Sequence, residues 1–105
     1  MANGIQIIDP EERFSLHLDG AELFLRRLDS ATQRAIERRH QAGRERAAVT
    51  DDVLDYVIQD WRGVLSPLGG AEVPCTRDNK LKLPSAVKLK VLSASQAPRA
   101  EDLPG

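Results

Sequence analysis

Residues 14–26 read FSLHLDGAELFLR, and this stretch decides the fold class. Its first five residues alternate apolar with polar side chains, which is the period of a half-buried strand. Asp19-Gly20 follows, a dipeptide that tolerates the positive φ angles of a tight hairpin turn. A second alternation runs over residues 21–26, so the stretch predicts a β-hairpin.

The second half of this hairpin is less regular than the first. Phe24 falls on the side that otherwise carries polar residues, so a helix over residues 21–41 stays open as an alternative. Before the hairpin, the isoleucines within residues 5–8 predict a further short edge strand that ends at Pro10.

Two helices are expected in the middle of the chain. The first covers residues 29–41, with Asp29 or Ser30 as its N-cap, and Gly43 ends it. Residues 43–49 are then expected to form a charged connector without regular structure.

The strongest helix signal covers residues 50–65. Thr50 is a good N-cap, and Asp51 and Asp52 would lie at the positive end of the helix dipole. Valines and a tryptophan at helical spacing would form one apolar face, and the helix would fray through Gly63.

The last part of the chain is predicted in three pieces. Thr76 is expected to cap a short helical turn that runs through Lys80. Residues 81–94 fit either a strand or a helix, and a helix from Pro84 to Ala94 is favoured because proline suits a first helical turn. Residues 95–105 are rich in proline and are expected to be a disordered, flexible tail.

The whole pattern predicts the α+β class. We expect one domain over residues 1–94, with an N-terminal β-hairpin or small antiparallel sheet packed against two or three α-helices. A chain of 105 residues suffices for one hydrophobic core, and its net charge of −1 gives no overall attraction to nucleic acid or anionic lipid. No apolar run is long enough to cross a membrane, and the single cysteine excludes an internal disulfide, so a cytoplasmic location is expected.

A search for catalytic chemistry predicts a protein that is not an enzyme. The two histidines, His17 and His40, lie far apart in the sequence and outside any HExxH metal motif. Cys75 has no histidine near it in the sequence that would act as a base. Glycine-rich phosphate-binding motifs and the GxSxG motif are absent, so no catalytic residue, metal or cofactor is expected.

The arginine-rich stretch Arg34–Arg46 raises nucleic-acid binding as an alternative function. The expected helices over residues 29–41 and 50–65 follow each other, but their connector is longer than the turn of a helix-turn-helix motif, and the second helix is acidic. Nucleic acid is therefore an unlikely partner by sequence, although a small regulator that uses this stretch stays open.

One segment resembles a known family. Residues 58–84 contain Trp61-Arg62-Gly63-Val64, then Gly69-Gly70, then Val73-Pro74-Cys75-Thr76-Arg77-Asp78-Asn79-Lys80, and finally Leu83-Pro84. This order is similar to that of small siphophage and prophage tail proteins of the tail assembly chaperone type. In that resemblance a helix ends in the tryptophan motif, a glycine-rich turn follows, and Leu-Pro starts a closing helix.

The resemblance implies a chaperone-like assembly factor without catalysis. It implies binding to the tape-measure or tail-tube protein in the bacterial host cytoplasm, with possible self-association into a homo-oligomer. A structural head–tail or tail component that stays in the virion is a further alternative. The contact would be a helix in a groove, through apolar surface left over on helix 50–65 or on the closing helix. The expected partner-binding residues are Arg34, Arg38, Arg39, Trp61, Val64 and Leu65, with Trp61 either a core residue or an anchor for the partner.

Overall fold

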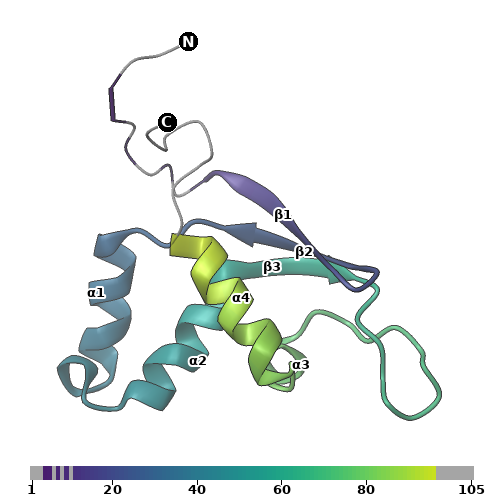
Figure 1. The fold of residues 1–105 in the computed structure, drawn as a ribbon. Helices are drawn as coiled ribbons and strands as arrows, with labels where there is room; N and C mark the ends of the chain where they lie inside the picture. The colour runs from purple at the N-terminus through teal and green to yellow at the C-terminus, as the bar shows by residue number, and fades with distance from the viewer. Residues whose placement is uncertain (1–3, 6, 8, 10, 97–105) are drawn as a thin grey trace.

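The computed structural model describes residues 4, 5, 7, 9 and 11–96, and they form an α+β fold (Figure 1). This confirms the predicted fold class. In chain order the elements are β1 (Arg13–Leu18), β2 (Ala21–Arg26), α1 (Ser30–Arg39), the 3-10 turn η1 (Gln41–Gly43), α2 (Arg46–Val57), β3 (Ile58–Arg62), α3 (Arg77–Leu81) and α4 (Ser85–Gln96). The strands form one antiparallel sheet in the order β1-β2-β3.

The predicted hairpin is confirmed, and the helical alternative for residues 21–41 is wrong in its first part. β1 and β2 pair in register from Arg13 opposite Arg26 to Leu18 opposite Ala21. Asp19 and Gly20 form the turn with φ angles of 49° and 83°. The expected strand at residues 5–8 falls partly outside the described residues, and the described positions 5 and 7 lie in no strand.

The predicted helix over residues 50–65 is wrong at both ends. α2 begins at Arg46 and stops at Val57, and the residues after it form the third strand. The helix starts early because Val49 belongs to the same buried stripe as Val53 and Val57. Thr50 and the aspartates after it therefore lie inside the helix and not at its cap, and the expected connector over residues 43–49 is helical from residue 46.

The strand β3 was missed in the sequence because a β-bulge interrupts its alternation of buried and exposed residues. Trp61 pairs with Leu23 and Ile58 pairs with Leu25, and the register shifts between Phe24 and Leu25. The extra residue in β3 turns Ile58 and Trp61 to the same buried face of the sheet, although they are three apart in sequence. A spacing of three is typical of a helix, which explains the mistaken prediction.

The other helices agree better with their signals. Asp29 caps α1 by accepting a hydrogen bond from the backbone N–H of Thr32, and Thr76 caps α3 in the same way from Asn79. The favoured helix near the C-terminus is confirmed as α4, which excludes the strand alternative. α4 runs to Gln96, and its buried Ser95 accepts a backbone hydrogen bond from Leu28 at 3.2 Å. The expected tail therefore cannot begin at residue 95, and residues 97–105 lie outside the described part.

The core lies between one face of the sheet and the helices α2 and α4, with α1 beside α2 at the end of the sheet (Figure 1). Each buried aliphatic side chain contributes roughly 1.5–3 kcal/mol through the apolar surface it removes from water. The buried apolar residues are Leu23, Leu25, Leu28, Ile36, Val49, Val53, Leu54, Val57, Ile58, Trp61, Leu83 and Val91.

The opposite face of the sheet carries the alternate residues of each strand, among them Ser15, Phe24 and Asp60. These side chains are exposed or half-buried, so this face is open in the described structure. Within the same described part of the chain, none of the helices combines the length and apolar content needed to cross a membrane.

Candidate functional site

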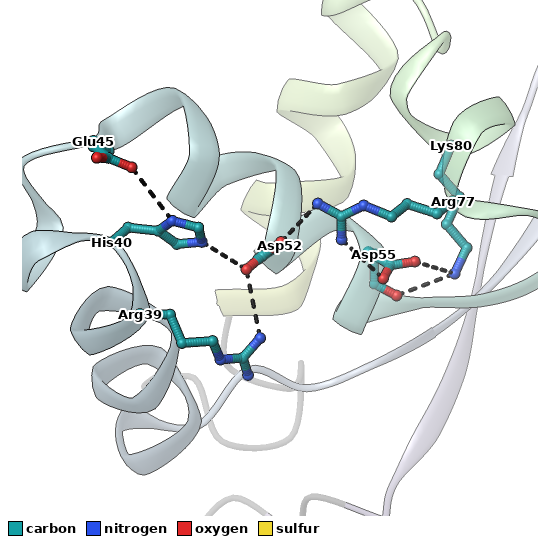
Figure 2. A network of polar contacts seen from close by, with 7 residues as sticks. All are labelled: Arg39, His40, Glu45, Asp52, Asp55, Arg77 and Lys80. Carbon is teal, nitrogen blue, oxygen red and sulfur yellow. Dashed lines mark hydrogen bonds and ion pairs between the residues drawn. The ribbon is translucent and has the colours of Figure 1, made fainter.

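A network of charged side chains joins α1, α2 and α3, and Asp52 is its centre (Figure 2). The Asp52 carboxylate lies 2.7 Å from His40 Nε2, 2.7 Å from Arg77 Nη2 and 3.5 Å from Arg39 Nη1. Its side chain is only 12% exposed, which strengthens these contacts relative to open water. Asp52 therefore fastens the end of α1 and the start of α3 to α2.

Asp55 forms the second half of the network, one helical turn further along α2 (Figure 2). Lys80 Nζ lies 3.0 Å from Asp55 Oδ1 and also donates to the Asp55 backbone oxygen at 3.1 Å. Arg77 Nη1 bonds the other carboxylate oxygen at 3.1 Å. The Lys80 side chain is buried, and its pairing with Asp55 compensates for the cost of removing the ammonium group from water.

The network shifts the titration of its acids and of one base. Hydrogen bonds from His40 and then Arg77 hold the pKa of Asp52 below its usual value. Burial of Asp55 opposes ionisation, but the bonds from Lys80 and Arg77 outweigh it and lower the pKa of this carboxyl. The pKa of Arg77 is raised by its hydrogen bonds to Asp52 and Asp55. All three shifts favour the charged forms, which is the behaviour of a stabilising ion network.

The network has the chemistry of a structural clamp. His40 lies between Asp52 and Glu45, with Nδ1 3.6 Å from a Glu45 oxygen (Figure 2). Within the described part of the chain, its polar side-chain contacts are with these carboxylates and include no hydroxyl or thiol. Cys75 has its pKa raised by burial, which disfavours the nucleophilic thiolate. Among the described residues, no group of three or more His, Cys, Asp or Glu side chains is placed to hold a metal ion.

The six expected partner-binding residues do not form one surface. Arg34, Arg38 and Arg39 are all exposed on α1, and Arg39 also contacts Asp52 at 3.5 Å. Trp61 is only 6% exposed, and its Nε1 donates to the Val73 backbone oxygen at 2.8 Å. Trp61 therefore serves the core and braces the loop that follows β3.

That loop, residues 63–73, projects from the body of the molecule beyond the end of β3, and we call it the finger (Figure 1). Backbone hydrogen bonds stiffen it, from Val73 to Val64 at 2.9 Å and from Ser66 to Ala71 at 2.8 Å. Two of its apolar side chains are exposed. Leu65, one of the expected partner-binding residues, is 58% exposed, and Leu68 is 89% exposed. Val64, half-buried at its base, packs against the core.

A recess of about 720 Å³ lies over the open face of the sheet and beside the junction of α2 and β3. Arg26 lines it, with its guanidinium carbon 3.6 Å from the centre of the Tyr56 ring and its Nε donating to the Tyr56 backbone oxygen at 2.7 Å. Phe24 and Arg13 also line the recess. It combines aromatic, cationic and acidic side chains, and none of its lining residues is among the six expected partner-binding residues.

The recess and the finger each had a signal in the sequence, whereas the charged network around Asp52 and Asp55 did not. Phe24 interrupted the hairpin alternation, and this irregularity marks an apolar side chain on the otherwise polar face. The Trp-Gly-Val segment pointed to the base of the finger. Nothing in the local sequence placed Arg77 and Lys80 opposite α2, because that contact joins residues more than twenty positions apart.

Comparison of the chain with protein-family models, with curated proteins and with solved structures gave no match.

Proposed function

We propose that this protein is a non-enzymatic assembly factor that binds another protein, of the tail assembly chaperone type found in phages and prophages. Its partner in this proposal is the tape-measure protein or another helical tail protein. The observation that carries the proposal is the finger, in which a braced loop holds Leu68 almost fully in solvent.

An exposed leucine on an ordered loop is a suitable anchor for a protein partner. Burying Leu68 in a partner pocket contributes roughly 1.5–3 kcal/mol. Because backbone hydrogen bonds already order the finger, binding loses less conformational entropy than it would with a flexible loop. The finger also lies within residues 58–84, the segment that resembles the tail proteins.

The contact surface in this proposal differs from the groove contact expected from the sequence. Val53, Leu54 and Val57 of α2 are all buried, so this helix has no apolar face left for a partner. On the closing helix α4, Leu89 is 67% exposed and is the alternative anchor. The proposal therefore assigns the first contact to the finger and leaves α4 as its competitor.

The test is co-expression with the tape-measure protein of the same phage or prophage genome, followed by affinity purification. The wild-type chain is expected to retain the tail protein at low and at moderate salt. Leu68→Asp is expected to lose most of it, and Leu89→Asp is the matched variant because it also replaces an exposed leucine. Loss with Leu89→Asp alone would assign the contact to α4, and no co-purification with the wild type would contradict the proposed function.

A specific observation keeps nucleic-acid binding as a second candidate. Arg34, Arg38, Arg44 and Arg46 are exposed, and within the described structure none of them has an ion pair with a carboxylate. Four free guanidinium groups are able to contact phosphates, and such binding weakens steeply between low and moderate salt. A gel-shift titration at two salt concentrations, with all four arginines replaced by glutamine as the control, decides this candidate.

A further inference from the structure

Two arginines stand directly opposite each other on the open face of the sheet. Arg13 of β1 pairs with Arg26 of β2 in the antiparallel register, and both line the recess. The Cβ atoms of such a pair lie about 4.5–5.5 Å apart, and like charges in this position repel each other. This repulsion therefore destabilises the sheet locally unless an anion lies between the two guanidinium groups.

Asp55 and Asp60 line the same recess, but neither is bonded to this pair of arginines in the described structure. Asp55 is bonded to Lys80 and Arg77 (Figure 2). Asp60 accepts the backbone N–H of Trp61 at 2.8 Å. Over residues 11–96, neither Arg13 nor Arg26 has an ion pair with a carboxylate. Two guanidinium groups therefore line the same recess, and within the described residues the terminal nitrogens of both make no hydrogen bond, since Arg26 bonds Tyr56 through its Nε.

The recess also has an aromatic side. The Tyr56 ring lies under Arg26 and fixes the direction of its guanidinium, and Phe24 is half-buried beside it. Arg62 approaches the Phe24 ring from the next strand at 5.7 Å. An apolar group of a ligand that lies on Phe24 would place an adjacent carboxylate within reach of Arg13 and Arg26.

We propose that this recess binds a carboxylate-bearing side chain of a partner protein, next to an apolar residue of the same segment. The inference rests on the proposed protein-binding function and adds a second contact to that of the finger. A carboxylate between the two guanidinium groups replaces their repulsion with two charge-assisted hydrogen bonds. A single carboxylate meets only the two guanidinium groups, whereas the repeated phosphates of a nucleic-acid backbone would also meet the carboxylates of Asp55 and Asp60 that line the recess, so a protein segment fits the site better.

The test uses two blocked dipeptides that differ in charge only, N-acetyl-Asp-Phe-amide and N-acetyl-Asn-Phe-amide. Each is titrated into the ¹⁵N-labelled full chain, and amide chemical shifts are followed by NMR. The aspartyl probe is expected to shift amides at residues 13–15, 24–26 and 58–60 with a Kd on the order of 1 mM. The asparaginyl probe is expected to bind about fivefold more weakly, as the loss of one exposed ion pair predicts.

The variants separate the recess from the rest of the surface. Arg13→Gln is expected to abolish the difference between the probes, and Lys90→Gln on α4 removes an exposed cation elsewhere and is expected to retain it. Arg26→Gln is a weaker test because Arg26 also bonds Tyr56. Equal binding of both probes, or shifts confined to other residues, would overturn the inference.

Two outcomes keep this inference distinct from the proposed function. If a ten-nucleotide oligothymidylate saturates the same amides at lower concentration than the aspartyl probe, the site recognises phosphate and the assignment to a protein segment is wrong. If the dipeptides behave as expected but no tail protein co-purifies with the chain, the recess stands and the identity of the proposed partner fails.

Discussion

Replacement of Gly63 by alanine tests how the finger leaves the sheet. Gly63 follows β3 with a φ of +78°, a region that alanine adopts at a cost of about 1–2 kcal/mol. A methyl group built there would lie 2.8 Å from the Gly20 backbone oxygen and 3.0 Å from Ala21 Cα. Both contacts are with backbone of the β1–β2 turn, so neither is relieved by rotating a side chain.

Gly70→Ala is the matched control. Gly70 lies in the same finger with a φ of +71°, but a methyl group built there would lie more than 4 Å from every described residue other than its two chain neighbours. It is expected to lose only the conformational cost of about 1–2 kcal/mol. Gly63→Ala is expected to lose that cost and a further 1–3 kcal/mol or so from overpacking.

The assay is urea unfolding followed by circular dichroism, with the free energy of unfolding taken from the midpoint and the slope. Unchanged slopes with a larger loss for Gly63→Ala would support the close approach of the finger base to the hairpin turn. Equal losses in the two variants would refute the reasoning, because they would show that the turn backbone does not restrict position 63.

Three further predictions concern the clamp, the core and a strained turn. Folding lowers the pKa of Asp52, so its contribution to the free energy of unfolding is present above the unfolded pKa and is lost as pH falls through the folded pKa. Thermal unfolding from pH 7 to pH 2 should therefore show that Asp52→Asn loses less stability in acid than the wild type, by on the order of 1 kcal/mol. Trp61→Phe removes the bond to the Val73 oxygen and is expected to cost about 1–3 kcal/mol in urea unfolding, whereas a loss near zero would contradict its bracing role. Ala42→Gly relieves a φ of +56° and is expected to raise the unfolding free energy by about 0.5–1 kcal/mol, so a destabilised variant would argue against that backbone strain.

The hairpin and α4 were predictable because their signals are local. Asp19-Gly20 sets the turn, and the apolar alternation before it sets the face of β1 that meets the core. Thr76 likewise caps α3 within its own turn. Short-range chemistry of this kind is written in adjacent residues, so it is readable without the structure.

The bulge that fits β3 to β2 also hides its strand pattern, so β3 could not be predicted from its own residues. Its bulge breaks the alternation of a strand and gives Ile58 and Trp61 the spacing of a helix. The strand forms because β2 has an open edge whose buried residues, Leu23 and Leu25, need partners from a distant segment. That requirement is a property of the sheet and not of residues 58–62 by themselves.

The candidate sites were predictable only in part. Arg34, Arg38 and Leu65 are exposed as a binding role requires, but Trp61 is buried and Arg39 is engaged by Asp52. The recess depends on the opposition of Arg13 and Arg26 across two strands, which follows from the hairpin register. The Asp19-Gly20 turn predicts this register, so the pairing of the two arginines could have been predicted from the sequence.

The outer edge of β3 carries a consequence for how this protein behaves at high concentration. The backbone N–H of Trp61 is occupied by the Asp60 carboxylate, and that of Gly63 by the Glu72 carboxylate. Carboxylates on these donors deny a strand from another molecule the hydrogen bonds it would need to extend the sheet. These two carboxylates thus leave fewer free donors for edge-to-edge pairing with another molecule, at the base of a finger whose Leu65 and Leu68 are exposed.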